Sequence, residues 1–166
     1  MSDREAPKFD PEDVRGLLYE YRMLVAMAQA WIARRSQPNN ACDFAVLESF
    51  LVHARNLHAF LRTRKDKEKD RRPGDYFAAD FVEGFGVEVY ERETVEKINR
   101  WLQHLTTWRY DDDEHPEWSL HELFLPVVKA MDDFLTSLET TSHGKAALTE
   151  CHDSGKLVAK ALLSAR

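Results

Sequence analysis

The chain has 166 residues, of which 43% are hydrophobic and 31% are charged, as in an ordinary soluble globular protein. This length predicts one domain that buries a sizeable core. Six glycines and six prolines are too few for a turn-rich all-β fold. The net charge of −6 excludes a global basic field for nucleic acid, so a polyanion would need a local basic patch.

The cysteines and the N-terminus predict a reduced, cytoplasmic setting. Cys42 and Cys151 have no partner at the spacing of a Cys-x-x-Cys motif. The first ten residues are polar, without the apolar core of a signal peptide, and are expected to be disordered. The longest charge-free stretch of the first helix, residues 23–33, is too short to span a bilayer. We therefore expect no membrane contact and a single domain over residues 11–166.

Two long amphipathic segments open this domain. Pro11, followed by Glu12 and Asp13, marks a helix start, because acidic residues interact favourably with the positive end of the helix dipole. Apolar residues spaced three and four apart continue this helix to about Arg35. A second helix is predicted over residues 41–64, and His58 is expected as a hydrogen-bonded core residue on its apolar face. That face consists of Phe44, Leu47, Phe50, Leu51, Ala54, Leu57, His58 and Leu61.

Residues 62–75 form a charged connection with two interpretations. One is a solvated helix end followed by a loop, and the other is a basic arm that contacts phosphate. The aromatic stretch 76–89 is predicted to cap one end of the bundle as a short helix. Its glycines, Gly84 and Gly86, follow no predicted strand, so they do not form a nucleotide-binding fingerprint.

Three further segments complete the predicted fold. A third helix is expected over residues 91–108, with an apolar stripe at three- and four-residue spacing. Ser119 and Glu122 form a capping-box pattern for a fourth helix, and Pro126 is predicted to kink it. A C-terminal helix is predicted over residues 145–163, with a break at 153–155. Together these segments predict an all-α bundle of four to five helices.

Metal and cofactor chemistry find no support in the motifs. No glutamate is followed three residues later by a histidine, as a di-iron bundle needs, and no two histidines are four residues apart, as in a zinc helix. There is no phosphate-binding glycine loop and no nucleophile elbow. The acidic loop 111–115 is expected to be solvated. We therefore expect neither a metal nor a cofactor, while a Ser/His/Asp triad stays open.

Two predicted helices combine an apolar stripe with Arg, Asn and His. On the third helix, Lys97 and His104 are seven residues apart and project from nearly the same side, with Arg100 between them. A histidine there is suited to act as a general base, and an adjacent cation to stabilise charge on a phosphate. The alternative is structural, because Lys and Arg also bury their stems beside aromatic rings. On the second helix, Arg55 and Asn56 offer similar groups.

These segments, residues 48–57 and 97–106, resemble small bacterial helical proteins. Those proteins carry Glu-Ser-Phe-hydrophobic-x-His-Ala-Arg-x-Leu on one helix and Arg-hydrophobic-Asn-Lys-x-hydrophobic-Ala-His-Leu-Thr on a later one. The pattern in turn resembles the HEPN (higher eukaryotes and prokaryotes nucleotide-binding) superfamily, over the layout of residues 41–140. Active members of that superfamily are metal-independent ribonucleases and usually dimers, whereas other members only bind nucleotides or partners.

The resemblance implies roles for individual residues of this chain. His104 takes the position of the catalytic histidine, Asn99 that of the asparagine and Lys97 that of the arginine. The hallmark of that superfamily is an arginine followed, after four to six residues, by a histidine. Lysine lacks the bidentate fork that arginine offers to phosphate. Arg100 is only four positions before His104, which is too close for the hallmark. Arg55, with Asn56, is then the candidate replacement cation.

Two functions follow from this resemblance. The first is a degenerate, non-catalytic HEPN-like module that binds a partner, a nucleotide or RNA through Arg55, Asn56 and Asn99. The alternative is a ribonuclease of a stress or defence system, with His104 as general base and Lys97 and Arg100 beside it. The resemblance implies a homodimer in both cases, and the abundance of large aromatic residues is consistent with one.

Overall fold

The structure is a computed structural model that describes residues 11–34, 41–62, 77–103, 117–138 and 144–164. Within these ranges the chain is helical and contains no strand, so the predicted all-α class is confirmed. The elements are α1 (Pro11–Arg34), α2 (Ala41–Leu61), the short 3-10 helix η2 (Ala78–Asp80), α3 (Arg92–Gln103), α4 (Leu120–Ser137) and α5 (Lys145–Ser164).

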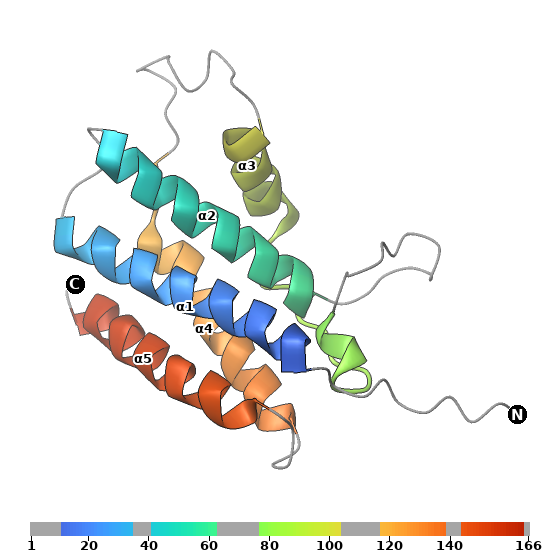
Figure 1. Cartoon of the computed structure of the whole chain (residues 1–166). Helices are drawn as coiled ribbons and strands as arrows, with labels where there is room; N and C mark the ends of the chain where they lie inside the picture. The colour runs from blue at the N-terminus through green and yellow to red at the C-terminus, as the bar shows by residue number, and fades with distance from the viewer. Residues whose placement is uncertain (1–10, 35–40, 63–76, 104–116, 139–143, 165–166) are drawn as a thin grey trace, which may run out of the picture.

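Helices α1, α2, α4 and α5 form a bundle, and α3 packs against α2 (Figure 1). The chain forms two antiparallel pairs, α1 with α2 and α4 with α5. Helix α2 runs parallel to α4, and α1 runs parallel to α5. Because α2 and α4 point the same way, the chain must return along the bundle between them, and this connection carries η2 and α3.

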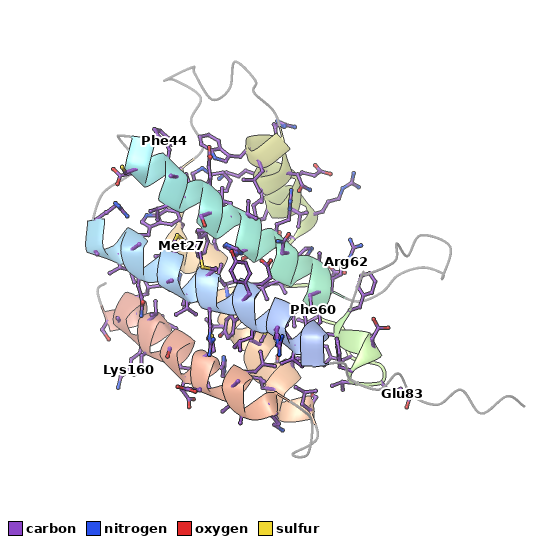
Figure 2. The ribbon with its side chains drawn as sticks, in the orientation of Figure 1. Met27, Phe44, Phe60, Arg62, Glu83 and Lys160 are labelled. Carbon is purple, nitrogen blue, oxygen red and sulfur yellow. The ribbon has the colours of Figure 1, made fainter. Side chains whose placement is uncertain are left out.

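Aromatic rings fill the interface between the two helix pairs. The ring of Phe50 packs edge-on against Trp31 of α1 and lies 6.4 Å from Phe124 of α4. Near the other end of α2, Phe60 packs edge-on against Phe134 of α4, with 5.3 Å between the ring centroids. Figure 2 shows Phe60 at this end of α2 and Phe44 at the opposite end. The apolar stripes predicted for α1, α2 and α4 therefore face one common core.

The helix boundaries follow local capping and packing. Ser119 caps α4 by accepting a hydrogen bond from the Glu122 backbone N–H at 3.3 Å, as the capping-box pattern predicted. Helix α4 then continues through Pro126 as far as Ser137. The predicted break at residues 153–155 is wrong, because α5 runs without interruption through Gly155, which is buried against α1.

The segment before α3 contains the short helix that the aromatic pattern predicted. The Asp80 carboxylate accepts a hydrogen bond from the Phe77 backbone N–H at 2.9 Å and closes η2. The Val87 N–H donates to the Leu61 carbonyl at 2.8 Å, which fixes this segment at the end of α2. The predictions for residues 1–10, 63–75 and 104–116 concern parts of the chain outside the described residues.

No helix within the described ranges is sufficiently long and apolar to cross a membrane. This finding agrees with the absence of a predicted span in the sequence.

Gly144 allows the start of α5 to pack closely against the start of α1. Its φ of +77° lies in the left-handed region that favours glycine. A Cβ atom at this position would lie 2.2 Å from Cγ1 of the buried Val14 side chain. Both the backbone conformation and the close packing therefore require glycine.

We expect Gly144→Ala to lower the free energy of unfolding by about 1–3 kcal/mol, because it adds backbone strain and a clash with Val14. Urea denaturation followed by circular dichroism measures this change. Gly16→Ala is the matched control, because Gly16 lies in α1 with no atom within 4 Å of an added Cβ. It should stabilise the protein by about 0.5–1 kcal/mol. Equal stability of the Gly144→Ala variant and the wild type would contradict the account.

Candidate functional site

The residues predicted to act together lie on two helices. Lys97, Asn99 and Arg100 are on α3, and Arg55 and Asn56 are on α2. His104, the predicted general base, lies outside the described residues. Asn99 is half-buried and Arg100 is exposed.

Lys97 connects α3 to the segment that precedes α4. Its Nζ donates a hydrogen bond to the Glu117 backbone carbonyl at 2.9 Å. The same Nζ lies 4.8 Å from the centroid of the Trp118 ring, close enough for a cation–π interaction. The Lys97 ammonium group therefore has two partners within the protein, and these contacts hold α3 to the segment before α4.

The cations on α2 and α3 lie at different levels of the bundle. Helices α2 and α3 run antiparallel, with Phe44 stacked on Trp101 and His58 stacked on Tyr90. This register places Arg55 level with the start of α3. Lys97, further along α3, is level with the first half of α2. Arg55 and Lys97 are therefore offset along the two helices.

Two polar side chains of α2, His53 and Asn56, instead face α1, where they form the α1–α2 polar cluster with Tyr19 and Glu20. One Glu20 carboxylate oxygen accepts a hydrogen bond from His53 Nδ1 at 2.7 Å. The same oxygen accepts a second hydrogen bond from the Asn56 amide at 3.1 Å. The exposed Tyr19 ring lies edge-on to His53, with 5.7 Å between the centroids. Glu20 was not predicted as a site residue, because its partners come from another helix.

The α1–α2 polar cluster is poorly suited to a phosphate. A carboxylate only accepts hydrogen bonds, so His53 and Asn56 must both direct a donor at Glu20. The Asn56 amide is thereby used within the protein. The carboxylate would also repel a phosphate that approached this cluster.

A second polar group, the buried polar chain, joins three helices. The Tyr21 hydroxyl of α1 lies 2.8 Å from His152 Nδ1 of α5. His152 Nε2 lies 2.9 Å from a carboxylate oxygen of Asp132 on α4. The Lys156 Nζ contacts the same oxygen at 2.7 Å. Tyr21 and His152 are buried, whereas the side chains of Asp132 and Lys156 are 50% and 51% exposed, so this chain meets solvent at its Asp132–Lys156 end.

Protonation states in the buried polar chain follow from its geometry. The Asp132 carboxylate accepts, so His152 must carry a proton on Nε2. Burial, with smaller contributions from Cys151 and Asp132, raises the pKa of the Tyr21 hydroxyl and keeps it protonated. Tyr21 then donates to the unprotonated Nδ1 of His152. With the proton on Nε2, Tyr21, His152 and Asp132 all have hydrogen-bond partners. The Tyr21 side chain is fully buried, so it is not accessible to a substrate.

His58 is a core residue, as predicted, but its hydrogen bonding differs from the expectation. Its ring is buried and stacks on Tyr90, with 5.5 Å between the centroids. The Tyr90 hydroxyl donates to the Leu123 carbonyl at 2.5 Å, so its proton does not go to His58. Among the described residues, His58 Nδ1 has no hydrogen-bond partner. Burial is the main cause of a lowered His58 pKa, which favours the neutral ring.

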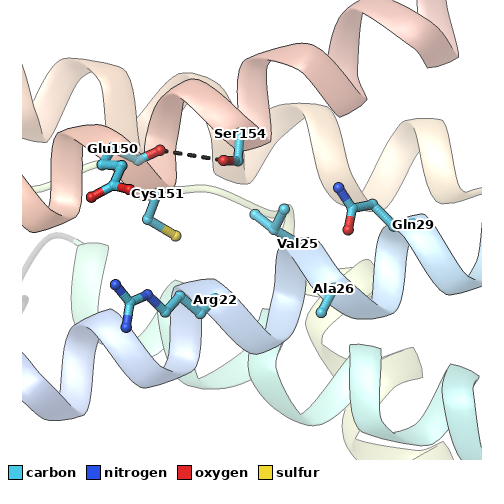
Figure 3. Close-up of a pocket in the computed structure, with 7 residues that line it drawn as sticks. All are labelled: Arg22, Val25, Ala26, Gln29, Glu150, Cys151 and Ser154. Atoms are coloured by element: carbon cyan, nitrogen blue, oxygen red, sulfur yellow. Dashed lines mark hydrogen bonds between the residues drawn. The ribbon is translucent and has the colours of Figure 1, made fainter.

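A small pocket lies on the outer side of the bundle between α1 and α5 (Figure 3). Its volume is about 250 Å³, and Cys151 contributes the buried thiol in its wall. Burial is the main cause of a raised pKa of this thiol, so it is a poor nucleophile. We call this pocket the α1–α5 groove. It is lined by Arg22, Val25, Ala26, Gln29, Glu150, Cys151 and Ser154.

Metal binding receives no support from the geometry. Across the five described ranges, no group of three or more His, Cys, Asp or Glu side chains is arranged to hold a metal ion. The acidic loop 111–115 lies outside those ranges.

Searches against protein-family models, curated proteins and solved structures returned no match to this chain. The resemblance to the HEPN superfamily therefore depends on the two sequence motifs alone. The function has to be inferred from the contacts within the bundle.

We expect Gly155→Ala to destabilise the protein by about 1–3 kcal/mol, because an added Cβ would lie 2.8 Å from the Tyr21 hydroxyl and disturb its bond to His152. Tyr21→Phe should cost about 1–3 kcal/mol, because it leaves His152 Nδ1 buried without a donor.

In the Tyr21→Phe background, the same Gly155→Ala change should be neutral or stabilising by up to about 1 kcal/mol. The clashing oxygen is then gone, and alanine is the better helix former. A double-mutant cycle by urea denaturation measures the coupling. Additive effects of the two changes would show that the hydroxyl does not restrict position 155.

The pH dependence of stability tests the solvent end of the buried polar chain. Hydrogen bonds from Lys156 and then His152 hold the pKa of Asp132 below its ordinary value of 3.8. A lowered folded-state pKa means that this stabilisation is present above pH 3.8 and is lost as the pH falls through the folded-state value. The contribution should be below about 1 kcal/mol, because Asp132 is half-exposed and screened by solvent.

We therefore expect Asp132→Asn to be less stable than the wild type at neutral pH, with the difference shrinking towards about pH 3. Urea denaturation at both pH values measures the difference. The exposed Asp133 next to it, whose carboxylate has no ion-pair partner among the described residues, is the control position. A difference between Asp132→Asn and wild type that does not change with pH would contradict the lowered pKa.

Proposed function

We propose that this chain is a non-catalytic, HEPN-like helical module that works by binding another protein surface. The observation that carries the proposal is the bond between His53 Nδ1 and Glu20, at 2.7 Å, with the Asn56 amide on the same oxygen. Polar side chains of the first motif thus serve the contact between α1 and α2. A nuclease or nucleotide site would need such donors to face its ligand.

Charge supports the same proposal. The net charge of −6 opposes the approach of a polyanion, and Glu20 adds a carboxylate beside His53 and Asn56. Lys97, which occupies the arginine position of the second motif, donates to a backbone carbonyl and lies over a tryptophan. A ribonuclease that used Lys97 would have to break both contacts before the ammonium group met a phosphate.

The ribonuclease alternative makes a different prediction and is tested directly. We expect the full chain to leave a fluorescently labelled single-stranded RNA uncut without added metal, at the level of a buffer blank. His104→Ala should behave like the wild type in this assay. Gel electrophoresis of a time course measures cleavage. Cleavage by the wild type that His104→Ala abolishes would make the protein a nuclease and refute the proposal.

RNA binding is measured in the same experiment by fluorescence anisotropy at two salt concentrations. We expect weak binding, with Arg55→Ala changing the affinity no more than Lys129→Ala does. Lys129 is the matched control, because it is an exposed cation on α4, away from both motifs. Tight, salt-dependent binding lost in Arg55→Ala alone would instead assign an RNA-binding function.

A further inference from the structure

The α1–α5 groove carries two opposite charges at one of its ends. Figure 3 shows Arg22 of α1 and Glu150 of α5 at this end, and Gln29 at the other. Both charged residues are exposed, and among the described residues neither side chain forms an ion pair. One end of the groove therefore presents a guanidinium group and a carboxylate on facing walls, both available to a ligand.

Next to the charged end, the groove is apolar. Val25 is buried, Ala26 adds a methyl group from the same helix, and the Cys151 thiol comes from α5. Burial is the main cause of the raised pKa of this thiol, the Arg22 charge lowers that pKa, and the Glu150 charge raises it. Both charges thus act on the thiol, so the charged end and the apolar part of the groove adjoin each other.

The two charges determine which kind of ligand fits the groove. A simple anion such as phosphate would be repelled by Glu150, and a simple cation would be repelled by Arg22. A molecule that carries both charges a short distance apart satisfies both groups. An α-amino acid is such a molecule, because its ammonium and carboxylate groups are attached to one carbon atom. An aliphatic side chain on that carbon matches the apolar part of the groove.

The size of the groove excludes larger ligands. Its volume of about 250 Å³ lies below the roughly 300–1,000 Å³ that is typical of pockets for drug-sized molecules. The groove therefore suits a single amino acid better than a nucleotide or a folded segment of another protein.

We propose that the α1–α5 groove binds a free aliphatic α-amino acid. The Arg22 guanidinium binds its carboxylate through charge-assisted hydrogen bonds, and the Glu150 carboxylate binds its ammonium group. The aliphatic side chain lies on Val25 and Ala26, next to Cys151. This inference goes beyond the proposed function and does not rest on it, because α1 and α5 carry neither of the two sequence motifs.

The first experiment is a titration of the full chain with L-leucine, followed by two-dimensional NMR at constant pH. We expect a dissociation constant of about 1 mM, as is reasonable for so small a ligand. Two analogues each lack one charge: 3-methylbutylamine has no carboxylate, and 4-methylpentanoate has no ammonium group. Each analogue should bind at least about tenfold more weakly. Absence of leucine binding up to about 20 mM, or equal binding of the analogues, overturns the inference.

Substitutions at the two charged positions test which ligand group each residue binds. Arg22→Gln should weaken leucine binding about tenfold but bind 3-methylbutylamine at least as well as the wild type does. Glu150→Gln should weaken leucine binding likewise but bind 4-methylpentanoate at least as well as the wild type. The controls Arg15→Gln and Asp153→Asn remove exposed charges of the same helices outside the groove, and should bind leucine normally. A variant that loses leucine and its analogue to the same extent contradicts the assigned contacts.

Cys151 reports whether leucine occupies this groove, because its thiol lines it. Alkylation with iodoacetamide at alkaline pH, quantified by peptide mass spectrometry, should slow up to about tenfold when leucine is present at ten times its dissociation constant. The exposed Cys42 of α2 is the internal control, and its alkylation should not change. Unchanged alkylation of Cys151 at saturating leucine places the ligand elsewhere and overturns the inference.

Discussion

The hydrogen bonds from Tyr21 through His152 to Asp132 fix how the two helix pairs of this bundle meet. Apolar side chains favour contact between α1 and α5, but a one-turn slide would still bury them. The polar groups allow no such slide, because a buried donor or acceptor without a partner costs about 1–3 kcal/mol. Gly155 belongs to the same constraint, since only a residue without Cβ lets the Tyr21 hydroxyl approach α5. The register between α1 and α5 is thus specified by one tyrosine, one histidine and one glycine.

The parallel arrangement of α2 and α4 determines where α3 lies. The chain must return the length of the bundle between them, and it uses that return to build η2 and α3. Helix α3 packs against α2 through the stacked rings of Phe44 and Trp101, and Lys97 connects it to the segment before α4. The described part of the second sequence motif, residues 97–103, therefore lies on an element attached at the side of the bundle. A lysine at its arginine position serves that attachment, which weakens the case for catalysis there.

The fold was largely predictable because its main signals are local. Apolar spacing in α1, α2 and α4 repeats within each helix, and the cap at Ser119 depends on residues three positions away. The break predicted at residues 153–155 was wrong because the local sequence marks glycine as a helix breaker. Gly155 instead provides the space that the Tyr21 hydroxyl of another helix needs. The partners of His152 are likewise invisible in the local sequence, since both of them come from distant parts of the chain.

Contacts between distant residues also limit how far the candidate site could be predicted from the sequence. Arg, Asn and His on an apolar helix indicate either a ligand site or a contact between helices, and the sequence of one helix cannot separate the two. The deciding residue was Glu20, which lies on α1, thirty-three positions from His53. Its carboxylate accepts hydrogen bonds from two donors of the motif, His53 and Asn56, so these donors serve the contact between α1 and α2. In a bundle of this kind, the residue on the neighbouring helix that pairs with a polar motif is as informative about function as the motif itself.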